Sequence, residues 1–374
     1  MTTTPTELSW AQVHAFRLQR HHLTRRAPRK DLAEVVGAMG GAQAQLMSAA
    51  ELQIATRVDC KVADVREALW EEKTLVKTWL MRGTLHLARA TDLPLFTAAM
   101  GRRWIHVRPS WLKFMDVTEQ ELWEIVANIG EAVSDKPMTR EELIAVVGRG
   151  RSARVSEVLK SGWGGMLKPA ARNGELCFGP NRGTSVTFVS PKKWLQEWRD
   201  VDPEAAIVEA ARRYLRAYGP ATKSDFARWW GAWPGVGNAA WSGMAGQLAH
   251  VSVEGMSMDL LATDVKAIAQ AKIDQPVQLL PNFDPYILGH ATRDHLFERA
   301  HSPKVSRTAG WISAVVLVDG SVAGTWTYTL AGKTFRVTVE PFGKLTSAVL
   351  KAIRDRAGEL SKAVGAAKAE VSVA

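Results

Sequence analysis

Hydrophobic and polar positions repeat one arrangement three times along the chain: a few short amphipathic helices, then two short strands around a tight turn. In the first copy, the pattern predicts helices over 31–36, 42–58 and 62–70 and strands over 74–80 and 84–88. This order is typical of a winged helix, which is a helix-turn-helix unit with an appended β-hairpin. A pattern that recurs in this way predicts tandem copies of one unit.

Capping signals support the repeat. Ser9, Thr139 and Thr222 each precede a helical pattern and have Gln or an acidic residue three positions later, as in a capping box. The Ser9 helix opens the first copy. The last helix of the second copy is predicted over 155–172 and stops at Asn173-Gly174, a natural left-handed end. Two further hairpins are predicted, over 175–178 with 184–189 and over 250–253 with 258–261.

The last quarter of the chain has a different pattern. Apolar and polar residues alternate over 311–318, 322–330 and 333–339, which predicts a three-stranded antiparallel meander, and a helix follows over 344–364. We therefore expect an α+β, mainly helical fold with three tandem winged helices, a C-terminal β-meander and a helix. The expected domains are 1–98, 99–200, 201–274 and 275–374.

The charge balance favours a polyanionic partner. Lys and Arg total 48 against 38 Asp and Glu, which gives a net charge of +10 and a pI near 9.7. Basic residues that neutralise phosphates release condensed counterions, and an anionic membrane surface would also attract them. No apolar run approaches the ~20 residues of a membrane span, and the start MTTTPTELSW is too hydrophilic for a signal peptide. Nucleic acid is therefore the favoured partner, with no membrane.

Several kinds of site are disfavoured by the motifs that the chain lacks. Cys60 and Cys177 are too few for a disulfide framework or a four-cysteine zinc site, and the nine histidines form no paired-ligand motif. No nucleophile elbow, phosphate-binding glycine loop or dinucleotide fingerprint occurs. We expect a reduced, intracellular protein without metal or cofactor.

Two segments are candidates for chemistry. Gln43-Ala44-Gln45 follows a Gly-Gly break in the most basic third of the chain. Residues i and i+2 point to different sides of a helix, so these amides converge only if Gln43 lies at an irregular helix start. Otherwise they are a solvated first turn. In the segment 279–290, Asp284 and His290 are either a turn former and a buried, satisfied histidine, or residues near a reacting sugar.

Five basic residues are candidates for DNA phosphate contacts, with plain solvent exposure as the alternative. The first copy carries a basic stretch of Arg17, Arg20, Arg25, Arg26, Arg29 and Lys30. We choose the Arg25-Arg26 pair from that stretch. On the second copy, the candidates are Lys168, Arg172 and the hairpin residue Arg182.

Three segments together resemble the AlkZ/YcaQ (AlkX) family of bacterial DNA glycosylases, and the similarity extends over nearly the whole chain. They are Gln43-Ala44-Gln45, Arg82-Gly83-Thr84-Leu85-His86-Leu87, and Pro281 to Tyr286 with Gly289-His290. The resemblance implies a C-shaped scaffold around duplex DNA and catalysis by Gln43 and Gln45. The second Gln, in place of Asp, is similar to the AlkZ branch. That branch implies self-resistance, the unhooking of azinomycin-type interstrand crosslinks and the excision of N7-alkylated guanine.

The chemistry of that substrate explains why neutral glutamines suffice. N7-alkylguanine already carries a positive charge, so it leaves as a neutral base without an acid. An amide then needs only to orient a water and to offer oxygen lone pairs to the developing sugar cation. We expect narrow substrates with labile bonds and, because no lysine is placed to form a Schiff base, a monofunctional enzyme. A crosslinked base cannot flip out, so we expect no deep nucleobase pocket.

Two alternatives stay open: a winged-helix transcriptional regulator, and a resistance protein that binds DNA or the drug without chemistry. Regulators commonly use one reading head and a dimerisation helix. Three copies without a heptad run favour a monomer that wraps DNA. We expect a bacterial cytoplasmic protein associated with the nucleoid.

Overall fold

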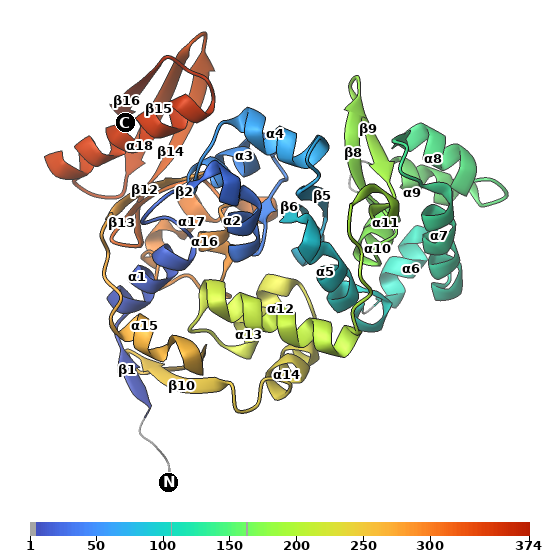
Figure 1. Ribbon diagram of the computed structural model, residues 1–374, viewed down its shortest axis with the longest axis horizontal. Helices are drawn as coiled ribbons and strands as arrows, with labels where there is room; N and C mark the ends of the chain where they lie inside the picture. The colour runs from blue at the N-terminus through green and yellow to red at the C-terminus, as the bar shows by residue number, and fades with distance from the viewer. Residues whose placement is uncertain (1–4, 106, 162–163) are drawn as a thin grey trace.

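The computed structural model describes residues 5–105, 107–161 and 164–374 of the chain. The fold is a mixture of helices and β-hairpins with more helix than strand, which confirms the predicted class (Figure 1). Residues 1–4, within the hydrophilic start considered above, lie outside the described part. No helix of the described residues is both long and apolar enough to cross a membrane.

The first unit contains a short strand that the sequence did not predict. Its elements are α2 (Leu32–Ala38), β3 (Ala42–Gln43), α3 (Met47–Ala55), α4 (Val62–Trp70), β5 (Leu75–Trp79) and β6 (Leu85–Arg89). The strands form a sheet in the order β3-β6-β5. The helix expected over 42–58 is wrong at its start, because Gly40 and Gly41 take φ of +71° and +101° and turn the chain onto the edge of β6. The helix begins only at Met47.

The second unit repeats this topology. Its elements are α7 (Glu119–Ala132), β7 (Met138–Thr139), α8 (Arg140–Val147), α9 (Ala153–Lys160), α10 (Leu167–Arg172), β8 (Cys177–Arg182) and β9 (Ser185–Val189), with sheet order β7-β9-β8. The capping box at Thr139 is confirmed. The helix predicted over 155–172 is two helices; residues 162 and 163 between them lie outside the described residues. Asn173 caps α10, and Gly174 has a φ of +77°.

The third unit includes the N-terminus of the chain. It contains α12 (Pro203–Tyr218), α13 (Lys223–Trp230), α14 (Pro234–Ser242), β10 (Leu248–Val253) and β11 (Met256–Leu261). A single bridge between Ala221 and Asp259 takes the place of its first strand. The strand β1 (Thr6–Leu8) pairs in parallel with β10, and α1 (Trp10–Arg20) packs Val13 and Phe16 into this core. The Ser9 helix was expected to open the first copy, but it packs here.

The C-terminal sheet is larger than the predicted meander. It has five strands in the order β12 (Val277–Leu280), β13 (Val315–Val318), β14 (Ser321–Ala331), β15 (Thr334–Pro341) and β16 (Lys368–Val373). The helix α18 (Ser347–Ala363) covers one face and carries the chain to β16, which pairs in parallel with β15. The sheet is therefore not purely antiparallel. It lies beside the first unit at the upper left of Figure 1.

The remaining helices connect these units, and aromatic packing joins the third unit to the rest. The connecting helices are α5 (Leu93–Met100), α6 (Pro109–Met115), α11 (Pro191–Trp194), α15 (Val265–Ala269), α16 (Pro285–Leu288) and α17 (Ser302–Val305). Tyr214 and Tyr218 stack on each other in the core, and the Trp229 ring packs against both at a tilt. The Tyr218 hydroxyl donates to the Met39 carbonyl at 2.7 Å, and the Tyr214 hydroxyl donates to the Gly289 carbonyl at 2.7 Å. The third unit thereby contacts the 279–290 segment directly and the chain shortly before the glutamine segment.

Candidate active site

The Gln-Ala-Gln segment is not helical: Gln43 ends strand β3, and Ala44 and Gln45 follow it before α3 begins. Gln43 pairs with His86 across the β3–β6 ladder, and the Ala44 N–H donates to the Leu85 carbonyl at 2.7 Å. Both glutamine side chains contact the β5–β6 hairpin, Gln43 through Arg82 and Gln45 through Leu85, without the irregular helix start that the sequence argument required. The expectation of a helix here is wrong, and the hairpin rather than a helix start holds the two amides.

The two glutamines differ in burial and in hydrogen bonding. Gln45 is exposed, and its Oε1 accepts from the Leu85 N–H at 3.0 Å. Gln43 is 6% exposed, and its Oε1 accepts from Arg82 Nη2 at 3.0 Å. Its backbone carbonyl accepts from Gln53 Nε2 at 3.2 Å. Both amides are thus oriented by the β5–β6 hairpin, and only Gln45 is open to solvent.

Arg82 at the hairpin tip is held on two sides. Its Nη1 donates to the Trp229 carbonyl at 2.6 Å while its Nη2 donates to Gln43. Its backbone has a φ of +57°, and a Cβ on Gly231 would lie 2.5 Å from the Arg82 Cα, so α13 packs closely against the tip. Burial lowers the pKa of Arg82 to about 10, so the guanidinium stays charged at neutral pH.

His86 lies opposite Gln43 and is neutral. Burial, followed by the nearby charge of Arg82, lowers the pKa of His86 to about 3. Its Nδ1 lies 2.9 Å from the Thr84 carbonyl, so Nδ1 carries the hydrogen and donates. His86 is therefore not in the imidazolium form that would act as an acid at neutral pH.

Asp284 is fully buried in an ion pair. Arg57 donates to it at 2.9 Å and 2.7 Å, and neither side chain has exposed surface. The same carboxylate accepts from the Tyr286 N–H at 3.0 Å, which starts α16. The nearby Asn282 carbonyl accepts from Gln53, the residue that also holds Gln43. Asp284 therefore matches the structural interpretation of this segment, as a turn-forming residue without access to solvent.

His290 is buried beside an arginine that the sequence gave no reason to single out. Arg17 Nη2 lies 2.7 Å from His290 Nε2, and Arg17 Nη1 lies 3.1 Å from His295 Nε2. Arg17 also donates to the Pro220 carbonyl at 2.8 Å. Burial, and then the charge of Arg17, hold the pKa of His290 well below its usual range, so His290 is neutral and accepts from the guanidinium. The sequence shows Arg17 only as part of a basic stretch.

The predicted DNA contacts divide into two groups. Lys168 and Arg172 line a cavity of about 470 Å³ together with Arg82 and Gly83 of the hairpin tip. The other three do not line it. Arg25 is exposed and has no side-chain partner in the described part of the chain. Arg26 donates to the Val58 carbonyl at 2.7 Å, and Arg182 donates to Glu142 at 2.7 Å and to the Pro137 carbonyl at 2.6 Å.

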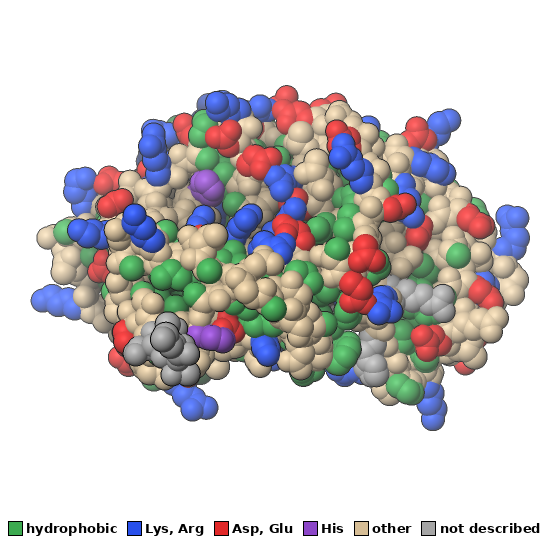
Figure 2. Space-filling view, turned by 60° about the horizontal axis from the view of Figure 1, so that its bottom comes forward, with side chains coloured by type: hydrophobic (Ala, Val, Ile, Leu, Met, Phe, Trp, Pro, Cys, Tyr) green, Lys and Arg blue, Asp and Glu red, His purple; other side chains and the backbone are tan. Residues whose placement is uncertain are grey.

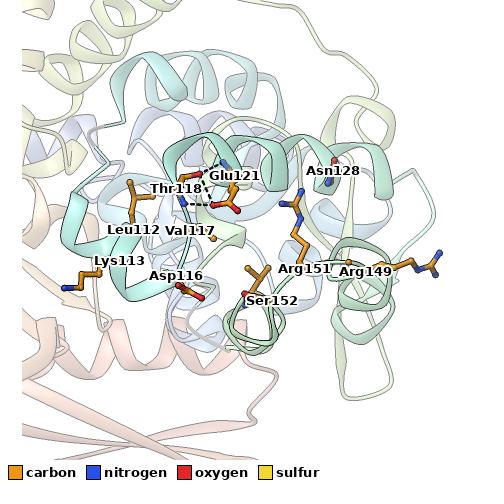
Figure 3. A pocket seen from close by; sticks show the side chains of 12 residues that line it. Leu112, Lys113, Asp116, Val117, Thr118, Glu121, Asn128, Arg149, Arg151 and Ser152 are labelled. Atoms are coloured by element: carbon orange, nitrogen blue, oxygen red, sulfur yellow. Dashed lines mark hydrogen bonds between the residues drawn. The ribbon is translucent and has the colours of Figure 1, made fainter.

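A cavity of about 710 Å³ lies between α6, α7 and the start of α9, but it holds none of the predicted site residues (Figure 3). Its charged lining is mixed, with Arg149 and Arg151 opposite Glu121. The contacts drawn between Thr118 and Glu121 are the capping box of α7. Size alone therefore does not identify the active site.

The surface of the molecule carries charges of both signs, and several Lys and Arg side chains gather near the middle of the face drawn in Figure 2. Within the described ranges, no group of three or more His, Cys, Asp and Glu side chains is placed to hold a metal ion. Both cysteines are free and buried. The chemistry available at the glutamine segment is that of neutral amides beside one guanidinium.

Known proteins resemble this chain over its whole length. The family model described as "DNA glycosylase AlkZ-like" matches residues 36–363. The interstrand DNA cross-link repair glycosylase of Streptomyces sahachiroi is 35% identical over 377 residues, which cover 98% of this chain and 99% of that protein. The solved structure of the S. sahachiroi DNA glycosylase AlkZ superimposes with a TM-score of 0.88 at 33% identity, covering 99% of this chain and 100% of the other. The chain belongs to the AlkZ-like family of DNA glycosylases.

Proposed function

We propose that this glycosylase hydrolyses the N-glycosidic bond of N7-alkylated guanine in duplex DNA and unhooks interstrand crosslinks. The observation that carries the proposal is the exposed Gln45, whose amide is held by the same β5–β6 hairpin that holds the buried Gln43. The S. sahachiroi relative is named as an interstrand crosslink repair glycosylase, and it aligns with nearly the whole chain. Self-resistance to azinomycin-type agents remains part of the proposal.

Gln45 is the residue that we assign to the reaction itself. Its Oε1 keeps one lone pair after accepting from Leu85, and its Nε2 has no hydrogen-bond partner among the described residues. These groups orient a water and face the positive charge that grows on the sugar. Gln43 offers its Nε2 to the sugar or to a phosphate, because Arg82 already occupies its oxygen. No charged acid is needed, because the alkylated base leaves neutral.

Asp284 and His290 act at a distance in this proposal. Asp284 pairs with Arg57, which follows the C-terminal end of α3, and so joins the 281–286 segment to that helix. His290 accepts from the buried Arg17. Both side chains are nearly or completely buried. We assign them positioning roles: they hold the elements that carry the glutamines and do not touch DNA.

The scaffold of the proposal is three tandem winged helices in a C-shaped arrangement around DNA. Two units have a short strand, helices and a hairpin with identical strand order, and the third has an equivalent bridge. We retain the boundaries 1–98, 99–200, 201–274 and 275–374, with the N-terminal strand and helix packed on the third unit. Lys168 and Arg172 bind phosphates near the active site; Arg25, Arg26 and Arg182 are more peripheral contacts. The enzyme acts as a monomer without a lyase step.

Single-turnover excision tests this function. A duplex with one N7-methyl-2′-deoxyguanosine is incubated with excess wild type, Gln45→Ala or the control Gln120→Ala, which changes an exposed glutamine on α7. We expect abasic sites from wild type and control. Gln45→Ala should lose at least a hundredfold in rate while its DNA affinity stays within a few-fold. Equal rates for Gln45→Ala and wild type would remove the motif from the mechanism, and no release by any form would refute the proposed reaction.

A further inference from the structure

The 470 Å³ cavity beside the hairpin tip has a lining that the excision chemistry does not use. It lies between Arg82-Gly83 of the β5–β6 hairpin, residues 105, 107, 108 and 111, α7 and α10. In Figure 1, this is the region where the hairpin meets the second unit. Neither glutamine lines it. Its volume falls within the roughly 300–1,000 Å³ of sites that hold small molecules.

The rim of the cavity is cationic and lacks a counter-charge. Arg82, Arg108, Lys168 and Arg172 line it, and no carboxylate from the described residues does. Arg172 Nε is buried without a hydrogen-bond partner, and burial lowers the pKa of both Lys168 and Arg172. A buried guanidinium N–H without a partner is costly, so the Arg172 side of this rim is suited to an anion supplied by a ligand.

The wall of the cavity is apolar. Ile105, Val107 and Trp111 are half-buried, and Leu122 is 1% exposed. An isolated phosphate gains nothing from such a wall, because apolar surface is stabilised only when another apolar group covers it. The occupant therefore combines an apolar body with neighbouring anionic groups.

Arg82 connects this cavity to the active site. The same side chain that lines the cavity donates to Gln43 Oε1 at 3.0 Å. The Arg82 side chain thus separates the cavity from a guanine that is held for attack at the glutamines. N7 of guanine is at the major-groove edge of the base, so a substituent on N7 projects into the groove between two phosphate backbones.

We propose that this cavity receives the apolar part of the substituent on guanine N7, while its rim cations bind the flanking phosphates. The proposal rests on the proposed glycosylase function and deepens it. Trp111 and Val107 then determine specificity for bulky adducts, and Lys168 and Arg172 contribute to binding of every duplex. The cavity takes the adduct and not the nucleobase, so it is compatible with a crosslinked base that stays in the stack.

Two duplexes that differ only in the N7 substituent test this proposal. One carries N7-methylguanine and the other N7-benzylguanine, and both bases are cationic. The single-turnover rate and the enzyme concentration that gives half of the maximal rate are measured for wild type and two cavity variants. Trp111→Ala removes an apolar side chain from the wall, and Val107→Trp fills the cavity. Trp233→Ala is the control, because Trp233 is 51% exposed and does not line this cavity. Lys168→Ala tests the rim.

Wild type should process the benzyl adduct with a higher kcat/KM than the methyl adduct. Trp111→Ala and Val107→Trp should each reduce that ratio roughly tenfold or more, because a misfitted apolar contact costs about that factor. Lys168→Ala should weaken both substrates equally. If wild type releases both bases and neither cavity variant changes the ratio, the cavity proposal is overturned and the glycosylase function stands. If wild type releases neither base, the proposed function itself fails.

Discussion

Replacing Asp284 by Asn separates its structural role from a catalytic one. Asn keeps an oxygen for the Tyr286 N–H and almost the same volume, but it removes the negative charge that Arg57 faces at 2.7 Å and 2.9 Å. Arg57 also donates to the Gln53 carbonyl at 2.9 Å and has no exposed surface. The substitution therefore leaves a buried guanidinium without its counter-charge.

The expected loss follows from that geometry. Removing one partner of a fully buried ion pair costs about 3–5 kcal/mol, because the other charge cannot return to water in the folded state. At about 1.4 kcal/mol per tenfold change, the unfolding equilibrium constant rises by two to three and a half decades. Adding Arg57→Met to Asp284→Asn removes the orphaned charge, so the double variant should recover part of the loss.

Urea denaturation followed by tryptophan fluorescence measures the free energy of unfolding. Asp294→Asn is the matched control, because Asp294 is exposed and lies in the same part of the chain; its effect should stay within about 0.5 kcal/mol. A loss below about 1 kcal/mol in Asp284→Asn, together with abolished excision, would refute the structural assignment. That result would place Asp284 in the chemistry instead.

Three further outcomes follow from the contacts described above. Ala44→Pro removes the 2.7 Å bond to Leu85 and should reduce excision more than tenfold, whereas Ala44→Gly keeps the N–H and most of the activity. Burial lowers the folded pKa values of His14, His86 and His295 to about 4, 3 and 2, below the unfolded value of 6.5. Each of them should therefore reduce the free energy of unfolding by about 1.4 kcal/mol per pH unit as the pH falls from 6.5 towards its folded pKa. Urea titrations measure this free energy, and above pH 6.5 these histidines should leave it unchanged. Arg172→Ala should lower the salt dependence of DNA binding by about one counterion, measured by fluorescence anisotropy; an unchanged slope would exclude a phosphate contact.

Local signals predicted the hairpins and helix starts because their determinants lie close together in the sequence. The Glu254-Gly255 turn joins β10 and β11 as expected, with a positive φ at both residues. The capping boxes at Thr139 and Thr222 pair groups only three residues apart. The hydrophobic alternation and the turn residues suffice for these elements, since no distant partner decides them.

Elements that depend on distant partners were missed. Ala42, Gln43 and Ala44 favour helix by intrinsic propensity, and their extended form exists only because β6, some 40 residues later, supplies hydrogen-bond partners. The same limit applies to the C-terminal sheet, where β12 and β16 were not predicted although both are paired. Arg17 resembles any other basic residue of its stretch. Its burial among histidines depends on a segment more than 270 residues away.

The environment of Gln43 gives a physical reason for an amide at this position. A carboxylate in its place would lie about one hydrogen-bond length from Arg82, whose charge persists at neutral pH, and the two would form an ion pair. Such a carboxylate would be neutralised by the guanidinium and would contribute little to stabilising a developing sugar cation. A neutral amide accepts from Arg82, keeps its N–H groups for the substrate and holds the hairpin tip in place. In the mechanism proposed above, Arg82 thereby makes orientation, rather than charge, the contribution of Gln43.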